Sequence, residues 1–212
     1  MKKRGILTVV SGFAGAGKGS TMKELLEKYA DRYALSVSVT TRAPRPGEEE
    51  GKAYYFRTKE QFEEMITNDE LIEYANYVGN YYGTPKEYVE KQLEEGKDVI
   101  LEIEIQGALK VKERMPDTVL LFISPPSANE LKRRLIGRGT EDLATIQKRL
   151  YRASEESEGI EKYDYFVIND SLEDCVEEVH MIIQSEKSRI FRNKDLINQI
   201  RNEVYAFRKE IS

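Results

Sequence analysis

The sequence predicts an α/β fold in which a parallel sheet carries helices on both faces. Three observations predict it. Apolar runs of strand length alternate with segments of helical periodicity, which is the order expected of βα units. A glycine-rich loop, residues 12–20, joins the first apolar run to the first helical pattern. The 212 residues are enough for one sizeable core with insertions and too few for two full-sized domains.

The glycine-rich loop predicts a site for the phosphates of a nucleotide. Gly12, Gly15 and Gly17 let the backbone turn so that successive N–H groups point at phosphate oxygens. The following helix adds its positive end, and Lys18 can reach the β- and γ-phosphates. The hydroxyl of Ser20, near the start of that helix, lies close to a nucleotide-bound magnesium. The alternative is a glycine-rich turn with a surface lysine.

A basic turn follows residues 35–41, whose alternation predicts one strand. Arg42 and Arg45 are three residues apart in a turn that prolines hold, beside several hydroxyl side chains. Because guanidinium groups pair bidentately with phosphate, this turn predicts a receptor for a second phosphate group. A solvated basic turn is the alternative.

Short, tyrosine-rich β segments then predict a small insertion on the main sheet. An aromatic strand over residues 51–56 precedes a helix over residues 58–66. Two further strands, residues 71–77 and 80–84, surround a turn.

The core resumes with a helix over residues 86–95 and a strongly apolar strand over residues 98–105. Glu102 and Glu104 stand near the end of this strand and, with the two-residue period of a strand, on one of its faces. Ligand crevices of open parallel sheets lie at the C-terminal ends of the strands. We therefore expect both carboxylates at the ligand crevice; carboxylates with a purely structural role are the alternative.

An arginine-rich helical segment follows the next buried strand. A helix over residues 128–136 carries Arg134, and a polar helix over residues 142–157 carries Arg149. Glycines flank Arg138 between the two helices. An arginine-bearing helix beside flexible glycines suits a lid that closes over a triphosphate. An ordinary charged helical hairpin is the alternative.

The chain ends with a strand over residues 163–170 and, from Ser171, a helical pattern that continues almost to Ser212. Its final part carries an apolar stripe, from Ile190 to Phe207. A free helix would leave this stripe in water. We expect it to pack on the core or on another subunit of a homo-oligomer.

Composition excludes several classes of protein. The formal net charge is −5, so general attraction to nucleic acid is not expected. The single cysteine, Cys175, excludes an intrachain disulfide, and the single histidine, His180, has no neighbouring metal ligand or catalytic partner in the sequence. No apolar stretch approaches membrane-spanning length, and no signal peptide precedes the first strand. We expect a cytoplasmic protein with no membrane partner.

Several separated motifs give the chain a resemblance to the bacterial guanylate kinases, over roughly residues 5–190. They occur in the family's order and spacing: GFAGAGKGS, SVSVTTRAPRPGEEEGKAYYF, LIEY, GNYYGTP, LEIEIQGA, RLIGRGTED and YFVIND. The resemblance implies a P-loop parallel-sheet core, a small mixed β/α insertion that binds GMP, and an arginine-rich helical lid. It also implies Mg²⁺-dependent phosphoryl transfer from ATP to GMP, giving ADP and GDP, with dGMP as a further acceptor.

The expected division of the chain follows from this resemblance and from the element order. The lid and the GMP-binding insertion interrupt one core, and a helical tail lies beyond the part shared with the family. The core takes residues 1–36, 90–136 and 161–190, the insertion residues 37–89, the lid residues 137–160 and the tail residues 191–212.

Carried over position by position, the resemblance implies three sets of site residues. ATP would lie on the loop, with adenine beside the last of these: Gly12, Phe13, Ala14, Gly15, Ala16, Gly17, Lys18, Gly19, Ser20 and Asn169. GMP would contact phosphate-binding and base-reading side chains: Ser38, Arg42, Arg45, Tyr54, Glu73, Tyr82, Thr84, Glu102 and Glu104. Cations would neutralise the transferring phosphoryl group: Lys18, Arg42, Arg134, Arg138 and Arg149. Magnesium would be held mainly through phosphates and water, near Ser20 and Glu102.

The chain departs from the family's usual pattern at two places. Phe13-Ala14 replaces Pro-Ser in the loop, and Glu104 stands where Asp is usual. Two alternatives remain: a non-catalytic peptide-binding scaffold of the same family, and a kinase for another nucleoside monophosphate. The intact loop with Lys18 argues against the scaffold, and Glu73 and Thr84 argue against other bases.

Overall fold

A five-stranded parallel sheet forms the centre of the computed structural model, which describes residues 3–77, 79–137 and 142–210. Its order, β2-β7-β1-β8-β9, places the first strand in the middle, and every neighbouring pair runs parallel. The α/β fold predicted from the sequence is therefore confirmed. The strands are β1 (Leu7–Gly12), β2 (Tyr33–Leu35), β7 (Asp98–Glu102), β8 (Val119–Ser124) and β9 (Tyr165–Ile168).

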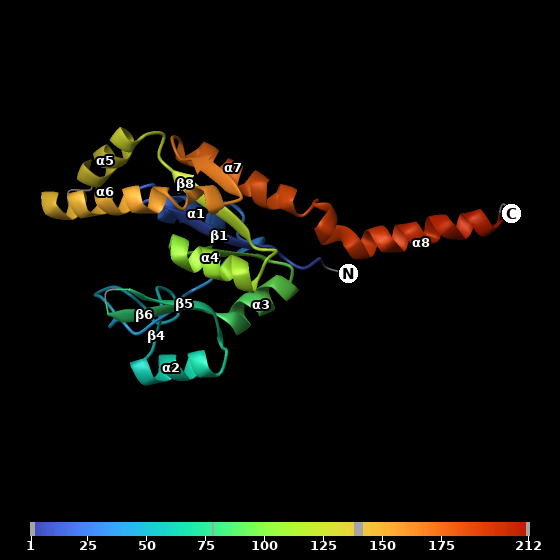
Figure 1. Ribbon diagram of the computed structural model, residues 1–212, viewed down its shortest axis with the longest axis horizontal. Helices are drawn as coiled ribbons and strands as arrows, with labels where there is room; N and C mark the ends of the chain where they lie inside the picture. Colours follow the sequence, from blue (N-terminus) through green and yellow to red (C-terminus); the bar gives the residue numbers. More distant parts are fainter. Residues whose placement is uncertain (1–2, 78, 138–141, 211–212) are drawn as a thin grey trace.

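Helices cover both faces of this sheet because its strands are apolar on both sides. Successive residues of β1 show the alternation: Val10 packs into the core cluster on one face and Val9 into the cluster on the other. Figure 1 shows the two helical layers on either side of β1. The Val10 face holds α1 (Lys18–Lys28) and α7 (Leu172–Glu186), and the Val9 face holds α3 (Lys86–Glu94) and α4 (Ile105–Arg114). With both faces covered, a ligand can approach the sheet at the ends of its strands.

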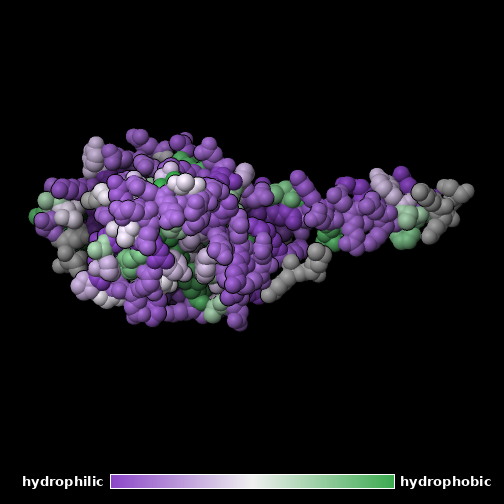
Figure 2. Space-filling view, turned by 90° about the horizontal axis from the view of Figure 1, so that it is seen from below, coloured by the Kyte–Doolittle hydropathy of each residue, from purple (hydrophilic) through white to green (hydrophobic). Residues whose placement is uncertain are grey.

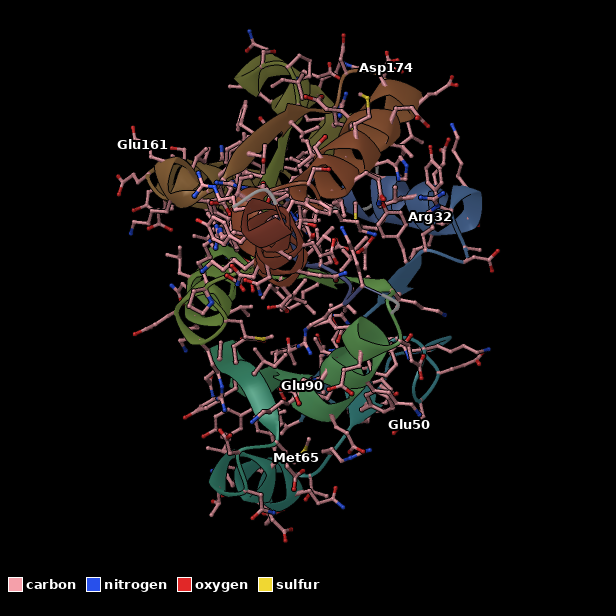
Figure 3. The ribbon with its side chains drawn as sticks, turned by 90° about the vertical axis from the view of Figure 1, so that its right-hand side faces the viewer. Arg32, Glu50, Met65, Glu90, Glu161 and Asp174 are labelled. Atoms are coloured by element: carbon pink, nitrogen blue, oxygen red, sulfur yellow. The ribbon has the colours of Figure 1, made fainter. Side chains whose placement is uncertain are left out.

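A second, mixed sheet of order β4-β3-β6-β5 forms the predicted insertion. β3 pairs parallel with β4, whereas the other two pairs are antiparallel. Helix α2 (Lys59–Thr67) packs on it through the fully buried Phe62 and starts with a capping box at Thr58. Figure 3 places Met65 of α2 and Asp174 of α7 at opposite ends of the molecule. The strands are β3 (Val39–Thr40), β4 (Tyr55–Phe56), β5 (Leu71–Tyr77) and β6 (Asn80–Pro85).

Two arginine-bearing helices, α5 (Ala128–Gly137) and α6 (Leu143–Ser157), pack on each other at one end of the core. Their apolar side chains form a small cluster of their own, and Phe13 of the glycine-rich loop packs against it. These helices are thus tied directly to the loop. A short 3₁₀ turn, η1 (Ile160–Lys162), leads from α6 to β9.

The single strand predicted over residues 35–41 is wrong. β2 ends at Leu35 in the core sheet and β3 begins at Val39 in the second sheet, so the chain crosses between sheets there. The Ser36 N–H still donates to the Ile100 carbonyl of β7, at 2.9 Å. Apolar alternation continues through the crossing because it records which side chains are buried, not which sheet they join.

The strand predicted over residues 98–105 is wrong at its end. β7 stops at Glu102, and Glu104 is already the N-cap residue of α4. The two carboxylates therefore do not share a strand face. Gly107 lets α4 approach the insertion closely, because a Cβ there would lie 3.1 Å from the Glu73 carboxylate.

The helix predicted from Ser171 almost to Ser212 is interrupted. α7 ends at Glu186, a 3₁₀ turn η2 (Ile190–Asn193) follows, and α8 (Lys194–Glu210) projects away from the body, as Figure 1 shows. Most of its large apolar side chains are between 46% and 59% exposed, whereas Ile197 is partly buried, and hydrophobic residues are visible on this projection in Figure 2. The expectation that the stripe packs on the core of the same chain is therefore wrong. The exposed residues are Leu196, Ile200, Val204 and Phe207.

Candidate active site

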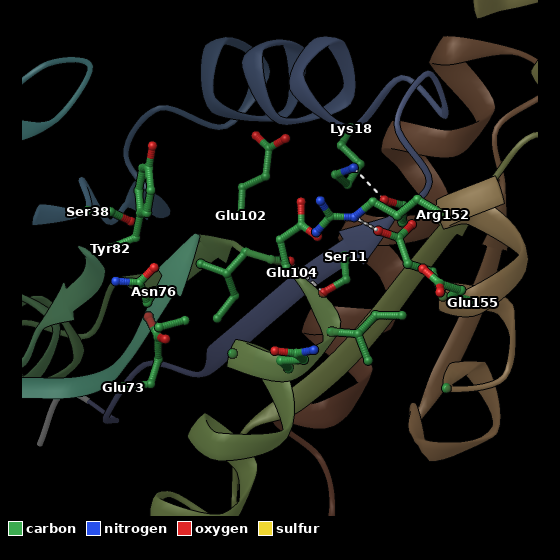
Figure 4. A pocket seen from close by; sticks show the side chains of 18 of the residues that line it. Ser11, Lys18, Ser38, Glu73, Asn76, Tyr82, Glu102, Glu104, Arg152 and Glu155 are labelled. Carbon is green, nitrogen blue, oxygen red and sulfur yellow. Dashed lines mark hydrogen bonds and ion pairs between the residues drawn. The ribbon is translucent and has the colours of Figure 1, made fainter. Parts of the chain in front are cut away.

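A cleft of about 880 Å³ lies between the insertion, the C-terminal ends of the core strands and α6. Figure 4 shows its lining, with the insertion on one side and α6 on the other. The insertion contributes Ser38, Tyr54, Glu73, Asn76 and Tyr82, the core contributes Ser11, Gly12, Lys18, Glu102 and Glu104, and α6 contributes Lys148, Tyr151, Arg152, Glu155 and Glu156. Residues from the predicted phosphate loop and the predicted base-reading set therefore share one cleft.

The glycine-rich loop connects β1 to α1 with left-handed turns at Gly15 (φ 96°) and Gly17 (φ 92°). The Lys18 ammonium donates to the Gly12 carbonyl at 2.6 Å, so it is folded back over the loop. Asn169 stabilises the loop, because its Nδ2 donates to the Ala16 carbonyl at 2.8 Å. A Cβ at Gly17 would lie 2.3 Å from this same nitrogen, which leaves room for glycine alone.

The Phe13 side chain is partly buried and packs against the hydrophobic core. Its ring meets Phe122 of β8 edge to face, with centroids 5.0 Å apart. It also packs against the apolar cluster of α5 and α6. The departure from the family's usual loop sequence thus adds an apolar contact between the loop and these two helices.

Arg134 of α5 lies beside the loop, outside the lining of the cleft. Its Nε donates to Glu130 at 2.7 Å, and its Nη2 donates to the Asn169 carbonyl at 2.8 Å. Hydrogen bonds from Arg133 and Arg134 lower the pKa of Glu130 to about 2. Arg149 lies on α6 and also outside the lining, while Arg138 falls outside the described residues.

The predicted second phosphate receptor is organised around a carboxylate, Glu48. Arg42 Nη2 contacts both Glu48 oxygens, at 2.8 and 2.9 Å, and its guanidinium carbon lies 5.3 Å from the Tyr54 ring centre. Glu48 also accepts from the Arg45 N–H at 2.8 Å. The Arg42 and Arg45 hydrogen bonds hold the pKa of Glu48 below its usual range. Tyr82 lies next to Tyr54, with ring centroids 5.9 Å apart, and the Arg45 side chain is exposed.

Glu73 is a buried carboxylate at the wall of the cleft. It is 7% exposed, and the Thr84 hydroxyl donates to its Oε1 at 2.8 Å. Burial raises the pKa of Glu73, and the Thr84 hydrogen bond and the charge of Lys110 oppose that rise only in part. Such a group binds ligand N–H donors strongly, because each donor it gains replaces water that burial removed.

Glu102 ends β7 at the floor of the cleft. The Glu102 side chain is accessible to water, but the surrounding walls of the cleft are close. This partial burial raises the pKa of Glu102, and the positive charge of Lys18 opposes the rise. Across the described residues, no three His, Cys, Asp or Glu side chains gather as metal ligands.

Glu104 meets α6 across the cleft. Arg152 Nη2 donates to Glu104 Oε2 at 2.6 Å, and Arg152 Nε donates to Glu156 Oε1 at 3.1 Å. Burial, and then the nearby Glu104 charge, raise the pKa of Glu156. The close-up in Figure 4 shows Arg152 reaching Glu104 from the opposite wall.

Sequence reasoning missed Glu48, Arg152 and Glu156. Glu48 had a readable signal, since a carboxylate inside a turn with two arginines is well placed to hold them. The pair of Arg152 and Glu156 also had a readable signal, since the two residues stand four apart on a predicted helix. The contact of Arg152 with Glu104 had none, because the two residues are 48 positions apart and only the fold brings them together.

The whole cleft-bearing part of the chain matches known proteins. Residues 4–186 match the sequence model of the guanylate kinase family. The guanylate kinase of Caldanaerobacter subterraneus subsp. tengcongensis is 53% identical over 203 residues, which cover 96% of this chain and 98% of that protein. The guanylate kinase of Lactococcus lactis subsp. lactis is 52% identical over 91% of this chain and 93% of its own. The crystal structure of guanylate kinase from Anaplasma phagocytophilum superimposes with a TM-score of 0.72, at 36% identity, over 90% of each chain.

Proposed function

This chain belongs to the guanylate kinase family, and from that premise we propose that GMP lies in the cleft between the insertion and α6 while ATP lies on the glycine-rich loop. The chain is an ATP:GMP phosphotransferase, which converts ATP and GMP to ADP and GDP. The observation that carries the proposed site is the position of Glu73, buried and paired with Thr84 in the same cleft as Lys18. The non-catalytic scaffold is not favoured.

Glu73 reads the guanine base in this proposal. Guanine offers N1–H and its 2-amino group as donors, whereas adenine has a lone pair at N1. A buried carboxylate therefore accepts hydrogen bonds from guanine, whereas with adenine it would face the N1 lone pair. In sites of this type, such a difference favours one base over the other by about 10⁴-fold or more. Thr84 orients the Glu73 carboxylate, and Glu104 accepts a hydrogen bond from the same edge of the guanine base.

The GMP phosphate is held by the turn that begins at Arg42. Arg42 and Arg45 supply guanidinium groups, and Ser38, Tyr54 and Tyr82 supply hydroxyls along the cleft. Glu48 fixes the turn through Arg42 and the Arg45 N–H. The phosphate thus meets a receptor whose shape is set before it binds.

The ATP phosphates lie on the backbone N–H groups of residues 12–20 and on Lys18. To reach them, the Lys18 ammonium exchanges its bond to the Gly12 carbonyl for phosphate oxygens. Asn169 holds the underside of the loop and lies near the adenine. In this proposal the segment of residues 128–160 closes on the transferring phosphoryl group and brings three arginines to it: Arg134, Arg138 and Arg149. No general base is needed, because the attacking GMP phosphate oxygen is already ionised.

Magnesium fits this site as a companion of the ATP phosphates. The Ser20 hydroxyl at the start of α1 and the Glu102 carboxylate, the latter through water, are the oxygen donors we assign to it. When bound, the ion neutralises charge on the β- and γ-phosphates.

We assign dGMP as a second acceptor and the cytoplasm as the location of the enzyme. The contacts proposed for GMP go to its base and its phosphate, so loss of the 2′-hydroxyl costs little. Within the described residues, no helix combines the length and the apolar character needed to cross a bilayer.

We also propose that α8 pairs in parallel with α8 of a second copy of this chain. Apolar residues of α8 follow a heptad, with the partly buried Ile197 and the exposed Val204 at a positions and the exposed Ile200 and Phe207 at d positions. β-branched residues at a positions favour two strands. In a parallel pair, Glu203 at g lies opposite Arg208 at e of the partner subunit, whereas an antiparallel pair brings arginines 201 and 208 together.

Sedimentation of the full chain tests the pairing. We expect a concentration-dependent dimer, a loss of dimer in Glu203→Arg, and its return in the double variant Glu203→Arg, Arg208→Glu. A monomer at every concentration would contradict the pairing. Failure of the double variant to restore the dimer would contradict the parallel orientation.

A coupled ADP-release assay tests the proposed acceptor site. With ATP and a panel of GMP, dGMP, AMP, CMP and UMP, we expect rapid turnover of the first two and at least a 10³-fold lower kcat/KM for the others, roughly what a buried, unpaired group imposes. Equal turnover of AMP and GMP would refute the assignment of Glu73 to guanine.

A further inference from the structure

The ion pair between Glu104 and Arg152 joins two walls of the cleft. Glu104 is the N-cap residue of α4, and Arg152 lies one helical turn before Glu156 on α6. The Nη2–Oε2 distance of 2.6 Å makes this a close contact, and Arg152 is held in turn by Glu156. All three side chains line the same cleft as Glu73.

Stability does not explain this pair. The Arg152 side chain is 37% exposed and the Glu104 side chain 66% exposed. Ion pairs this open to water contribute little to folding, because solvent screens them and two long side chains lose freedom. Its position in the substrate cleft is the feature that needs an explanation.

Glu104 has a positioning problem that a shorter residue would not have. A glutamate has one more rotatable bond than an aspartate, so its carboxylate samples more positions unless a neighbouring side chain holds it. Arg152 donates to Oε2 of this carboxylate, and a carboxylate can accept further hydrogen bonds from a ligand at the same time. Glu156 keeps the guanidinium in place, and the arginine in turn lies between two carboxylates that repel each other.

We propose that Arg152 is a positioning residue for guanine selection, which holds the Glu104 carboxylate where it accepts from the 2-amino group of the base. The inference rests on the proposed function, since it takes Glu104 to lie at the base edge of GMP. It adds that recognition of the 2-amino group depends on α6, a helix outside the insertion.

The test compares GMP with IMP, which differs from GMP only in lacking the 2-amino group. The kcat/KM values for both acceptors, with IMP also assayed as a competitive inhibitor, are measured for wild type, Arg152→Gln, Arg152→Lys and Glu104→Gln. Lys148→Gln is the matched control, because it removes one positive charge from the same cleft-facing helix. Unfolding midpoints confirm that each variant is folded.

We expect Arg152→Gln to lower the GMP-to-IMP ratio of kcat/KM about tenfold, through the KM of GMP, with IMP and ATP kinetics nearly unchanged. Arg152→Lys should recover part of the ratio, and Lys148→Gln should leave it at the wild-type value. An unchanged ratio in Arg152→Gln, or an equal loss for GMP and IMP, overturns the inference.

The variant Glu104→Gln distinguishes the role of Glu104 in reading the 2-amino group from the role of Arg152 in positioning Glu104. If it lowers the ratio while Arg152→Gln does not, Glu104 reads the 2-amino group without help from α6, and the present inference alone fails. If neither variant changes the ratio while GMP remains the preferred acceptor over AMP, Glu104 does not read that group. The inference then fails, and the assignment of Glu73 survives.

Discussion

Among single residues, Glu73 lowers the stability of the unliganded protein through its burial and, in the proposed function, recognises the guanine base. The carboxylate is buried, and among the described residues it accepts a hydrogen bond from the Thr84 hydroxyl. An ionised group in such a place gives up hydration that a bound guanine restores through its N1–H and 2-amino donors. If Glu73 reads the base as proposed, the same burial that weakens the unliganded protein strengthens its selection of guanine.

Glu73→Gln should raise the KM of GMP by about 10- to 100-fold, the scale of a hydrogen bond to a charged group. The KM of ATP should stay nearly constant, because the proposed ATP site is on the loop at the other end of the cleft. Steady-state kinetics with each substrate varied in turn measures both. Unchanged GMP kinetics would show that the base lies elsewhere.

Glu73→Gln should also stabilise the unliganded protein near neutral pH. The pKa of Glu73 is raised in the folded state, so the folded state binds more protons than the unfolded state between the two pKa values. Wild-type stability therefore falls as pH rises through that window, whereas glutamine does not titrate. Urea unfolding should give a larger advantage for the variant at pH 8 than at pH 4. The opposite trend would show that Glu73 is stabilised by its charge.

Arg149→Ala should lower kcat by roughly 10³-fold or more and leave both KM values nearly unchanged, because the role proposed for Arg149 is to neutralise charge that develops during transfer. Single-turnover kinetics separates this effect from product release. A tenfold rise in either KM with an intact kcat would instead make Arg149 a ground-state binding residue.

At the scale of elements, most strands and helices could be predicted from local patterns, and their sheet partners could not. The loop and its helix, the insertion and the lid helices all carry signals within a few residues. The crossing between Leu35 and Val39 and the end of β7 at Glu102 depend on which strand lies alongside. The contacts of Asn169 with the loop and of Arg152 with Glu104 need the assembled fold in the same way.

The C-terminal elements are anchored by one buried carboxylate, Glu186, at the end of α7. It accepts from the Tyr165 hydroxyl at 2.5 Å and pairs with Arg189 and Arg192 at 3.1 and 3.3 Å. Burial alone would raise the pKa of Glu186, but the Tyr165 and Arg189 hydrogen bonds outweigh it and the pKa is lowered. β9, α7 and η2 therefore meet at this group.

Glu186→Gln should lower the free energy of unfolding by about 1–3 kcal/mol at pH 7, since hydrogen bonds to a charged group are lost. The contribution of Glu186 is present above the pKa of an unfolded glutamate and is lost as pH falls through the lower folded value. Urea unfolding at pH 7 and at pH 3 should therefore show a difference from wild type at the first pH that shrinks at the second. An equal difference at both would assign the effect to packing.

Considered as a whole, the molecule places an anion-binding cleft inside an acidic protein. The net charge of −5 repels nucleotides at long range, so their affinity depends on local cations and backbone N–H groups. The core contributes the loop, the insertion contributes Glu73, with Arg42 next to the lining residue Tyr54, and α6 forms the opposite wall. A nucleotide bound across them makes contacts that no single part offers.

The most direct test of this account is a crystal structure of the full chain with GMP bound. We expect guanine N1 and the 2-amino group within hydrogen-bond distance of the Glu73 carboxylate, and the phosphate against Arg42, Tyr54 and Tyr82. GMP bound outside this cleft, or inside it with its base away from Glu73, would contradict the account.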